Sequence, residues 1–220
     1  MAQAFFISGI DTDCGKTFIT AHIARNLHNS GVRVITQKLV QTGCTEISED
    51  IIEHRRIMQI PLQDVDTKGI TCPYNFAFPA SPHFSAALEH REIDTNRITK
   101  STEILLQQYD IVLIETAGGL YVPLSETLFC CNYMAAHKHP LMFVTTSKLG
   151  SINHSISSLK NIKDLHIPLY AVVYNRLPNS DAAIAQNTEA FLRKYVQREF
   201  PDTIFITSEK ILDGHSVIQH

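Results

Sequence analysis

Residues 4–17 read AFFISGIDTDCGKT, and the two halves of this stretch differ in character. The first half is a short apolar run that is typical of a buried strand. An amphipathic segment with Ile19, Ile23 and Leu27 follows the second half. A glycine-rich loop between a strand and a helix is the form of a phosphate-binding P-loop, because its backbone N–H groups and the positive end of the helix can face an anion. The order of these segments therefore predicts a site for nucleotide phosphates.

In such a loop, Lys16 reaches the β- and γ-phosphates and the Thr17 hydroxyl is a ligand of Mg²⁺. The general pattern has four residues between its first glycine and Gly-Lys-Thr, whereas five residues separate Gly9 from Gly15 here. A polar turn that contains Gly-Lys-Thr by chance is the alternative interpretation. The preceding strand and the following helix favour phosphate binding.

Composition limits the kinds of partner. A chain of 220 residues with 44% hydrophobic content can bury a full core, and we expect one α/β domain over residues 1–220. The net charge of −3 and the lack of blocks of like charge predict neither a nucleic-acid nor a membrane partner. Small molecules and a second copy of the chain are the expected partners.

Several features predict a cytoplasmic location. No apolar run approaches the ~18 residues of a membrane span, and a strand begins at once without a charged leader. The five cysteines have no C-x-x-C spacing, which predicts neither a disulfide framework nor a zinc site. The 11 histidines are scattered along the chain.

Short apolar runs and helical patterns alternate along the chain. Strands are predicted at residues 4–7, 32–35, 111–114, 141–144, 169–173 and 204–206. Helices are predicted after the P-loop with Gly31 as the C-cap, at 48–59, after the N-cap Asp94, at 152–165 and at 182–200. This alternation predicts a doubly wound, mostly parallel sheet flanked by helices, of the P-loop NTPase type. Residues 67–85 hold three prolines and are interpreted as a long surface loop.

Ligands of such sheets bind beyond the carboxyl ends of the strands, where two charged residues stand. Lys38 ends the second predicted strand; it either neutralises the γ-phosphate or is a solvated strand end. Glu115 follows a buried run and precedes Ala117-Gly118-Gly119, which favours a carboxylate ligand of Mg²⁺. Asp50 is either a further carboxylate ligand or an ordinary acid at a helix start.

Two more groups follow later strands. Gly150 and Ser151 would present free N–H groups at a helix start, which is either an anion site or a plain capping turn. Asn175 ends the strand at 169–174, where a side-chain amide can contact the edge of a purine.

Five stretches in this order resemble the dethiobiotin synthetase family. They read GIDTDCGKT at 9–17, KLVQTG at 38–43, SPHFSAALE at 81–89, IETAGGLYVPL at 114–124 and KLGSINH at 148–154. The resemblance runs from Phe6 to Asn175, and the family's P-loop also carries the extra residue noted above.

This resemblance implies a homodimer that uses ATP, Mg²⁺ and CO₂ to form dethiobiotin from 7,8-diaminopelargonic acid. One amine captures CO₂ as a carbamate, the carbamate attacks the γ-phosphate, and the second amine closes the ring and expels phosphate. Lys16 and Lys38 would be the catalytic residues, because they neutralise the carbamate and the phosphoryl oxygens.

The resemblance also implies a residue for each binding role. Mg²⁺ would be held by Thr17, Asp50 and Glu115. The nucleotide would contact Asp13, Cys14, Gly15, Lys16, Thr17, Phe18, Asp50, Glu115, Thr116, Ala117, Gly118, Asn175, Arg176 and Glu209. The substrate would contact Thr12, Lys38 and Thr42 and, across the dimer interface, Gly150, Ser151 and Asn153.

Three positions depart from the family pattern. Leu39 replaces a proline and removes a fixed φ next to Lys38. Thr116 replaces a glycine and would be strained if that position requires a positive φ. Residues 205–209 lack an Ile-Pro step, which bears on the contacts with adenine.

Three alternatives remain. A related amide-forming ligase, such as a cobyrinic-acid amide synthase, would add a glutaminase domain for which 220 residues leave no room. A ParA- or MinD-like ATPase would carry a second lysine early in the P-loop, where this chain has Ile10 and Asp11. A degenerate family member would bind nucleotide without turnover, which the changes at Leu39 and Thr116 leave open.

Overall fold

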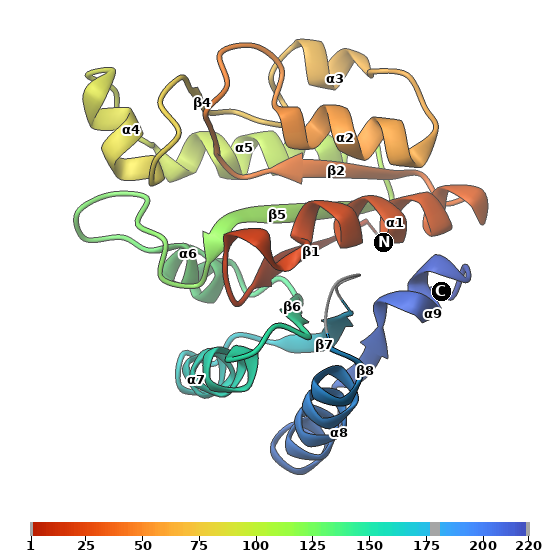
Figure 1. Ribbon diagram of the computed structural model, residues 1–220. Helices are drawn as coiled ribbons and strands as arrows, with labels where there is room; N and C mark the ends of the chain where they lie inside the picture. The colour runs from red at the N-terminus through yellow and green to blue at the C-terminus, as the bar shows by residue number, and fades with distance from the viewer. Residues whose placement is uncertain (1, 177–180, 219–220) are drawn as a thin grey trace.

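A six-stranded sheet runs through the middle of the computed structural model, which describes residues 2–176 and 181–218 (Figure 1). Every pair of neighbouring strands in it is parallel. The strands lie in the order β2 (Val34–Lys38), β5 (Ile111–Gly119), β1 (Gln3–Gly9), β6 (Leu141–Thr146), β7 (Leu169–Asn175) and β8 (Ile204–Thr207). The predicted doubly wound α/β fold is confirmed.

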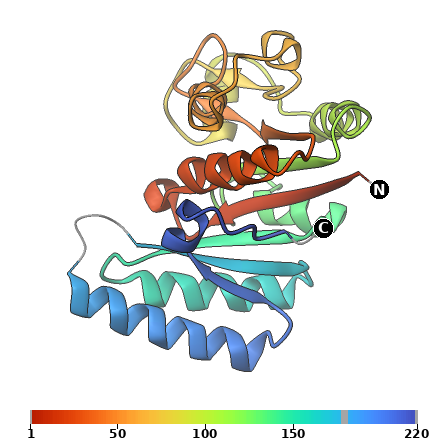
Figure 2. The same ribbon diagram turned by 90° about the vertical axis from the view of Figure 1, so that its right-hand side faces the viewer.

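Helices cover both faces of this sheet (Figures 1 and 2). Alternate residues of β1 enter different cores, with Phe6 on one face and Phe5 and Ile7 on the other. The face with Phe5 packs against α1 (Lys16–Asn29), the end of α2 (Glu49–Met58) and α9 (Ser208–Leu212). The face with Phe6 packs against α5 (Thr95–Leu106), α6 (Cys130–His137), α7 (Ser151–Asp164) and α8 (Ala182–Glu199).

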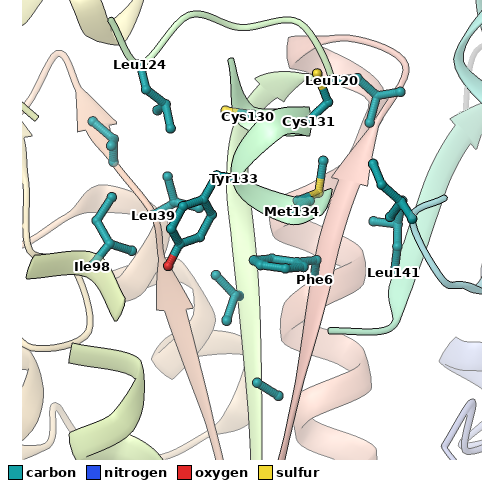
Figure 3. Close-up of a cluster of buried hydrophobic side chains, with 14 of the residues drawn as sticks. Phe6, Leu39, Ile98, Leu120, Leu124, Cys130, Cys131, Tyr133, Met134 and Leu141 are labelled. Atoms are coloured by element: carbon teal, nitrogen blue, oxygen red, sulfur yellow. The ribbon is translucent and has the colours of Figure 1, made fainter. Parts of the chain in front are cut away.

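Figure 3 shows part of the core on the Phe6 face. The ring of Phe6 meets the ring of Tyr133 edge to face, with 5.9 Å between centroids, and Met134 lies beside it. Leu39 and Ile98 close the other side of this core, and both are fully buried. This cluster fixes α6 and the end of β2 against β5.

The predicted elements occur with small shifts at their ends. The second strand begins at Val34 rather than at residue 32 and reaches Lys38. The Ser48 hydroxyl caps α2 by accepting the N–H of Ile51, and Asp94 caps α5 as predicted. The C-cap of α1 is Ser30, and Gly31 follows it with a φ of +83°.

The interpretation of residues 67–85 as a surface loop is wrong. The segment contains β4 (Asn75–Phe76), which pairs with β3 (Gln41–Thr42), and it enters α4 (Pro82–Leu88). Tyr74 and Phe76 are buried. Together with α3 (Asp64–Thr67) this segment lies beside β2 (Figure 1). Removing the apolar rings between the prolines from water stabilises this position of the segment.

None of the helices in the described part of the chain combines the length and apolar character that crossing a bilayer requires. All five cysteines are buried and free.

Candidate active site

The P-loop has the predicted strand, loop and helix. The chain leaves β1 at Gly9, passes a short 3₁₀ turn at Thr12–Cys14, and enters α1 through Gly15, whose φ is +90°. A Cβ atom on Gly9 would lie 2.3 Å from the Cys14 sulfur. A side chain at position 9 would therefore force Cys14 to shift and would crowd the Val144 carbonyl oxygen at 3.0 Å, so glycine suits the close approach of the loop to the end of its own strand.

The Lys16 ammonium lies inside the curve of this loop. Its Nζ donates to the Asp11 carbonyl oxygen at 2.6 Å and to the Thr12 carbonyl oxygen at 3.1 Å, and the residue is 3% exposed. In both hydrogen bonds the ammonium donates to a backbone carbonyl oxygen rather than to a carboxylate, so neither contact neutralises its positive charge. That is the electrostatic setting in which a lysine attracts phosphate oxygens.

A cavity of about 570 Å³ opens at the carboxyl ends of β1, β2 and β5. Its wall is completed by residues 79–82, from the segment that the sequence predicted as a loop. Ten of the predicted site residues line it: Thr12, Asp13, Lys16, Thr17, Lys38, Thr42, Asp50, Glu115, Ala117 and Gly118. The two predicted catalytic lysines therefore reach one and the same cavity.

Lys38 lies between two carboxylates on the wall of this cavity. The register of β2 and β5 places it opposite Glu115, and its Nζ donates to Glu115 Oε1 at 2.8 Å. The same ammonium forms an ion pair with Asp50 at the start of α2. The Thr17 hydroxyl donates to Glu115 Oε1 at 2.9 Å. Carboxylates from α2 and β5 thus contact one cation, and the Thr17 hydroxyl of α1 hydrogen-bonds to one of them, Glu115.

Burial disfavours the charged forms of Lys38 and Glu115, but interactions with neighbouring charged and hydrogen-bonding groups outweigh this effect for both residues. Glu115 and Asp50 outweigh the desolvation of Lys38 and raise the pKa of its ammonium. Lys38 and a hydrogen bond from His54 outweigh the desolvation of Glu115 and hold the pKa of its carboxyl well below the usual range. Both groups are therefore charged at neutral pH.

Two departures from the family pattern have local explanations. Thr116 does not have a positive φ, so the condition for backbone strain there is not met, and its buried hydroxyl donates to Ser8 Oγ at 2.9 Å. Next to Lys38, the Leu39 N–H donates to the Glu115 carbonyl oxygen at 2.9 Å. A proline could not make that bond. The backbone that carries Lys38 is therefore tied directly to β5.

Asn175, the last residue of β7, lies next to the P-loop. Its Nδ2 donates to the Cys14 carbonyl oxygen at 3.0 Å, and a Cβ on Gly15 would collide with it at 2.1 Å. Arg176 follows and pairs with Glu209 of α9 at 3.3 Å. The predicted purine-side residues are thus brought together beyond the ends of β7 and β8.

Other predicted residues lie outside the main cavity. Phe18 is 39% exposed and its ring packs on His22, 4.4 Å between centroids. Gly150 and Asn153 are exposed at the start of α7. Ser151 lines a separate cavity of about 100 Å³ with Asp13 and Cys14, and its buried Oγ has no hydrogen-bond partner in residues 2–176 and 181–218.

The sequence interpretation missed His54. This fully buried residue lies on α2, and its Nε2 is 3.0 Å from Glu115 Oε2. His54 follows Asp50 by four residues, and this spacing places both side chains on one face of a helix. That spacing is the feature of the sequence from which a role for His54 near Asp50 could have been predicted.

The chain is similar in sequence to one protein family over nearly its whole length. A family model described as an AAA domain matches residues 3–201. An ATP-dependent dethiobiotin synthetase (BioD 2) of Pasteurella multocida is 47% identical over 205 residues, which span 93% of this chain and 96% of the relative. The dethiobiotin synthetase of Chlorobaculum tepidum is 48% identical over 203 residues, spanning 90% of this chain and 85% of the relative.

Solved structures with a similar fold include ParA and MinD proteins. The ParA protein of pNOB8, solved bound to nonspecific DNA, has a TM-score of 0.56 at 16% identity and covers 94% of this chain and 85% of its own. MinD of Aquifex aeolicus has a TM-score of 0.50 at 16% identity, with 97% and 86% covered. At such identities the similarity shows the fold alone.

By sequence over nearly its whole length, the chain belongs to the family of ATP-dependent dethiobiotin synthetases.

Proposed function

We propose that this protein converts 7,8-diaminopelargonic acid and CO₂ into dethiobiotin with hydrolysis of ATP. The observation that carries the proposal is the shared cavity of Lys16 and Lys38, with Lys38 charged and held by Glu115 and Asp50. ATP-dependent dethiobiotin synthesis is what the names of relatives at 44–48% identity describe.

The reaction places negative charge where these lysines lie. An oxygen of a carbamate on one substrate amine attacks the γ-phosphorus of ATP, the bond from that phosphorus to the bridging oxygen breaks, and ADP leaves as a carbamic–phosphoric anhydride forms. The second amine then attacks the carbonyl carbon of this anhydride, loses a proton, closes the ring and expels phosphate. Lys38 would neutralise the carbamate from β2, and Lys16 would neutralise the phosphoryl oxygens from α1. Preorganised cations of this kind stabilise the transition state without exchanging protons.

Thr17, Asp50 and Glu115 would hold Mg²⁺. These hard oxygen donors are a set that Mg²⁺ accepts when phosphate oxygens and water complete its shell. The fit is supported by the Lys38 ammonium, a cation that already lies between Asp50 and Glu115. When bound, Mg²⁺ supplies neutralisation of the ATP phosphates.

We assign the remaining contacts by position. The backbone from Asp13 to Phe18 would surround the phosphates, together with Thr116, Ala117 and Gly118 after β5. Asn175 and Arg176 would contact adenine and Glu209 the ribose, which is supported by their cluster beside the P-loop. Thr12 and Thr42 would contact the substrate, which is supported by their position in the lining of the cavity.

We further propose that two chains complete one site, with Gly150, Ser151 and Asn153 of one protomer receiving the substrate carboxylate of the other. The Ser151 hydroxyl at the start of α7, which has no hydrogen-bond partner among the described residues, supports an anion there. We treat residues 1–220 as a single domain and place the enzyme in the cytoplasm, an assignment that the free cysteines support.

The test is product formation by the purified protein with Mg·ATP, bicarbonate and diaminopelargonic acid. Dethiobiotin and stoichiometric phosphate are expected, and Lys38→Ala should abolish both. Phosphate release stimulated instead by DNA, or by an acid with an ammonia donor, would reject the assignment in favour of a ParA-like ATPase or an amide-forming ligase. Nucleotide binding without any turnover would identify a degenerate member.

A further inference from the structure

We propose that His54 is a positioning residue that fixes the orientation of the Glu115 carboxylate and so sets the strength of divalent-cation binding. The inference rests on the proposed function, because it takes Glu115 as one of the groups that hold the metal.

The two oxygens of Glu115 have separate partners. Oε1 receives hydrogen bonds from Thr17 at 2.9 Å and from Lys38 at 2.8 Å and faces the cavity. Oε2 lies 3.0 Å from His54 Nε2 in a fully buried contact. The carboxylate therefore presents one oxygen to the cavity while the imidazole holds the other.

The hydrogen bonds around the imidazole have one consistent direction. An ionised carboxylate only accepts, so His54 Nε2 donates to Glu115. Nδ1 then accepts from the Thr36 hydroxyl at 2.9 Å, and Thr36 Oγ1 accepts from Arg55 at 2.8 Å. The chain of donors runs from the Arg55 guanidinium through Thr36 and His54 to Glu115.

The start of this chain is itself fixed. The Arg55 guanidinium donates to both oxygens of Asp66, at 2.9 and 2.8 Å. Every side chain in this hydrogen-bond chain is buried, namely those of Arg55, Thr36, His54 and Glu115. His54 and Asp50 lie on the same helix, so α2 positions both a carboxylate and the residue that orients the opposing carboxylate. Without His54, Glu115 would lose the only partner of Oε2 among the described residues and could turn about its last torsion.

Binding of Mn²⁺ in place of Mg²⁺, in the presence of ADP and followed by electron paramagnetic resonance, tests this proposal. His54→Leu should weaken Mn²⁺ binding by about tenfold or more, the usual effect of losing a partner that orients a ligand. His54→Gln can still donate to Glu115 and should stay within about threefold of the wild type. Thr36→Val, which keeps the imidazole but removes its donor, should lie between the two.

Thr102→Val is the matched control for a loss of buried hydrogen bonding. Thr102 donates to Gln37 at 2.8 Å and does not contact Glu115, so this variant should lose stability and keep wild-type Mn²⁺ affinity. Equal loss in Thr102→Val and His54→Leu would overturn the proposal, as would wild-type affinity in His54→Leu. Asp50→Asn should also weaken Mn²⁺ binding.

The proposed reaction can fail independently. Loss of Mn²⁺ affinity in the His54 and Thr36 variants, in a protein that forms no dethiobiotin, would reject the reaction and retain the role of His54. Formation of dethiobiotin, together with unchanged Mn²⁺ affinity in those variants, would support the reaction and reject the role of His54.

Discussion

Replacing Lys38 with methionine removes a buried cation and nearly preserves side-chain volume. Lys38 is 6% exposed and Glu115 is fully buried, and loss of one partner of such a pair costs about 3–5 kcal/mol. The Asp50 side chain is 24% exposed, so water can hydrate its carboxylate after the lysine is removed. We therefore expect a loss in the free energy of unfolding at the lower end of this range, about 3 kcal/mol at pH 8. For a chain of this length that corresponds to a fall in Tm of about 6–12 °C.

The dependence of this loss on pH follows from the two pKa shifts. In the wild type, the depressed pKa of Glu115 contributes stability that is present above its ordinary value of 4.5 and is lost as pH falls through the lower, folded value. The raised pKa of Lys38 contributes stability that is present below its ordinary value of 10.5 and is lost only in strong base. The pair therefore stabilises the fold throughout the neutral range.

In the variant, burial acts on Glu115 with only the hydrogen bonds from His54 and Thr17 to oppose it, and we expect its pKa to rise above the ordinary value of 4.5. A raised carboxyl pKa contributes stability in acid that is lost as pH rises. The penalty of Lys38→Met should thus be largest at pH 8 and smaller at pH 5.

Urea unfolding followed by circular dichroism at both pH values measures this difference. Lys16→Met is the control, because the Lys16 ammonium hydrogen-bonds to carbonyl oxygens rather than to a carboxylate, and its penalty should not change with pH. A Lys38→Met penalty below 1 kcal/mol at pH 8, or one equal at the two pH values, would refute the reasoning.

Three further outcomes are expected. Gly9→Ala should weaken ATP binding in calorimetry by at least about tenfold, because its Cβ would force Cys14 and the P-loop to shift; unchanged affinity would show that the loop adapts freely. Asn175→Leu should raise the KM for ATP more than it lowers kcat, since its amide tethers the P-loop backbone at Cys14; a pure loss of kcat in steady-state assays would contradict this. Asp66→Asn should lower the free energy of unfolding by about 3 kcal/mol at pH 7. Burial opposes ionisation of Asp66, but Arg55 holds its pKa below the ordinary 3.8. The Asp66→Asn penalty should therefore shrink as pH falls below that value, and an unfolding penalty that grows in acid would be evidence against the pair.

Residues 67–85 show where prediction from sequence reached its limit. Three prolines correctly indicated irregular backbone, but proline content does not report whether the side chains between them are buried. Tyr74 and Phe76 pack into the core and the segment supplies one wall of the cavity. Whether an apolar ring is buried depends on the surface that neighbouring elements present to it, which the ring's own segment does not encode.

Local sequence was enough for the P-loop, the six strands of the main sheet and the five longest helices of the described residues, but not for α3, α4, α6 and α9. The periods of helix and strand and the capping preferences are properties of the backbone, and they are clearest in long elements. It also indicated Lys38 and Glu115 one at a time. Their contact was decided by the order and register of β2 and β5, which bring residues 77 positions apart into one ion pair. The φ of Thr116 and the hydrogen bond from His54 to Glu115 were likewise settled only in three dimensions. A short-range pattern limits what each segment can form, whereas the charges and donors that meet at a site depend on packing between segments that are far apart in the chain.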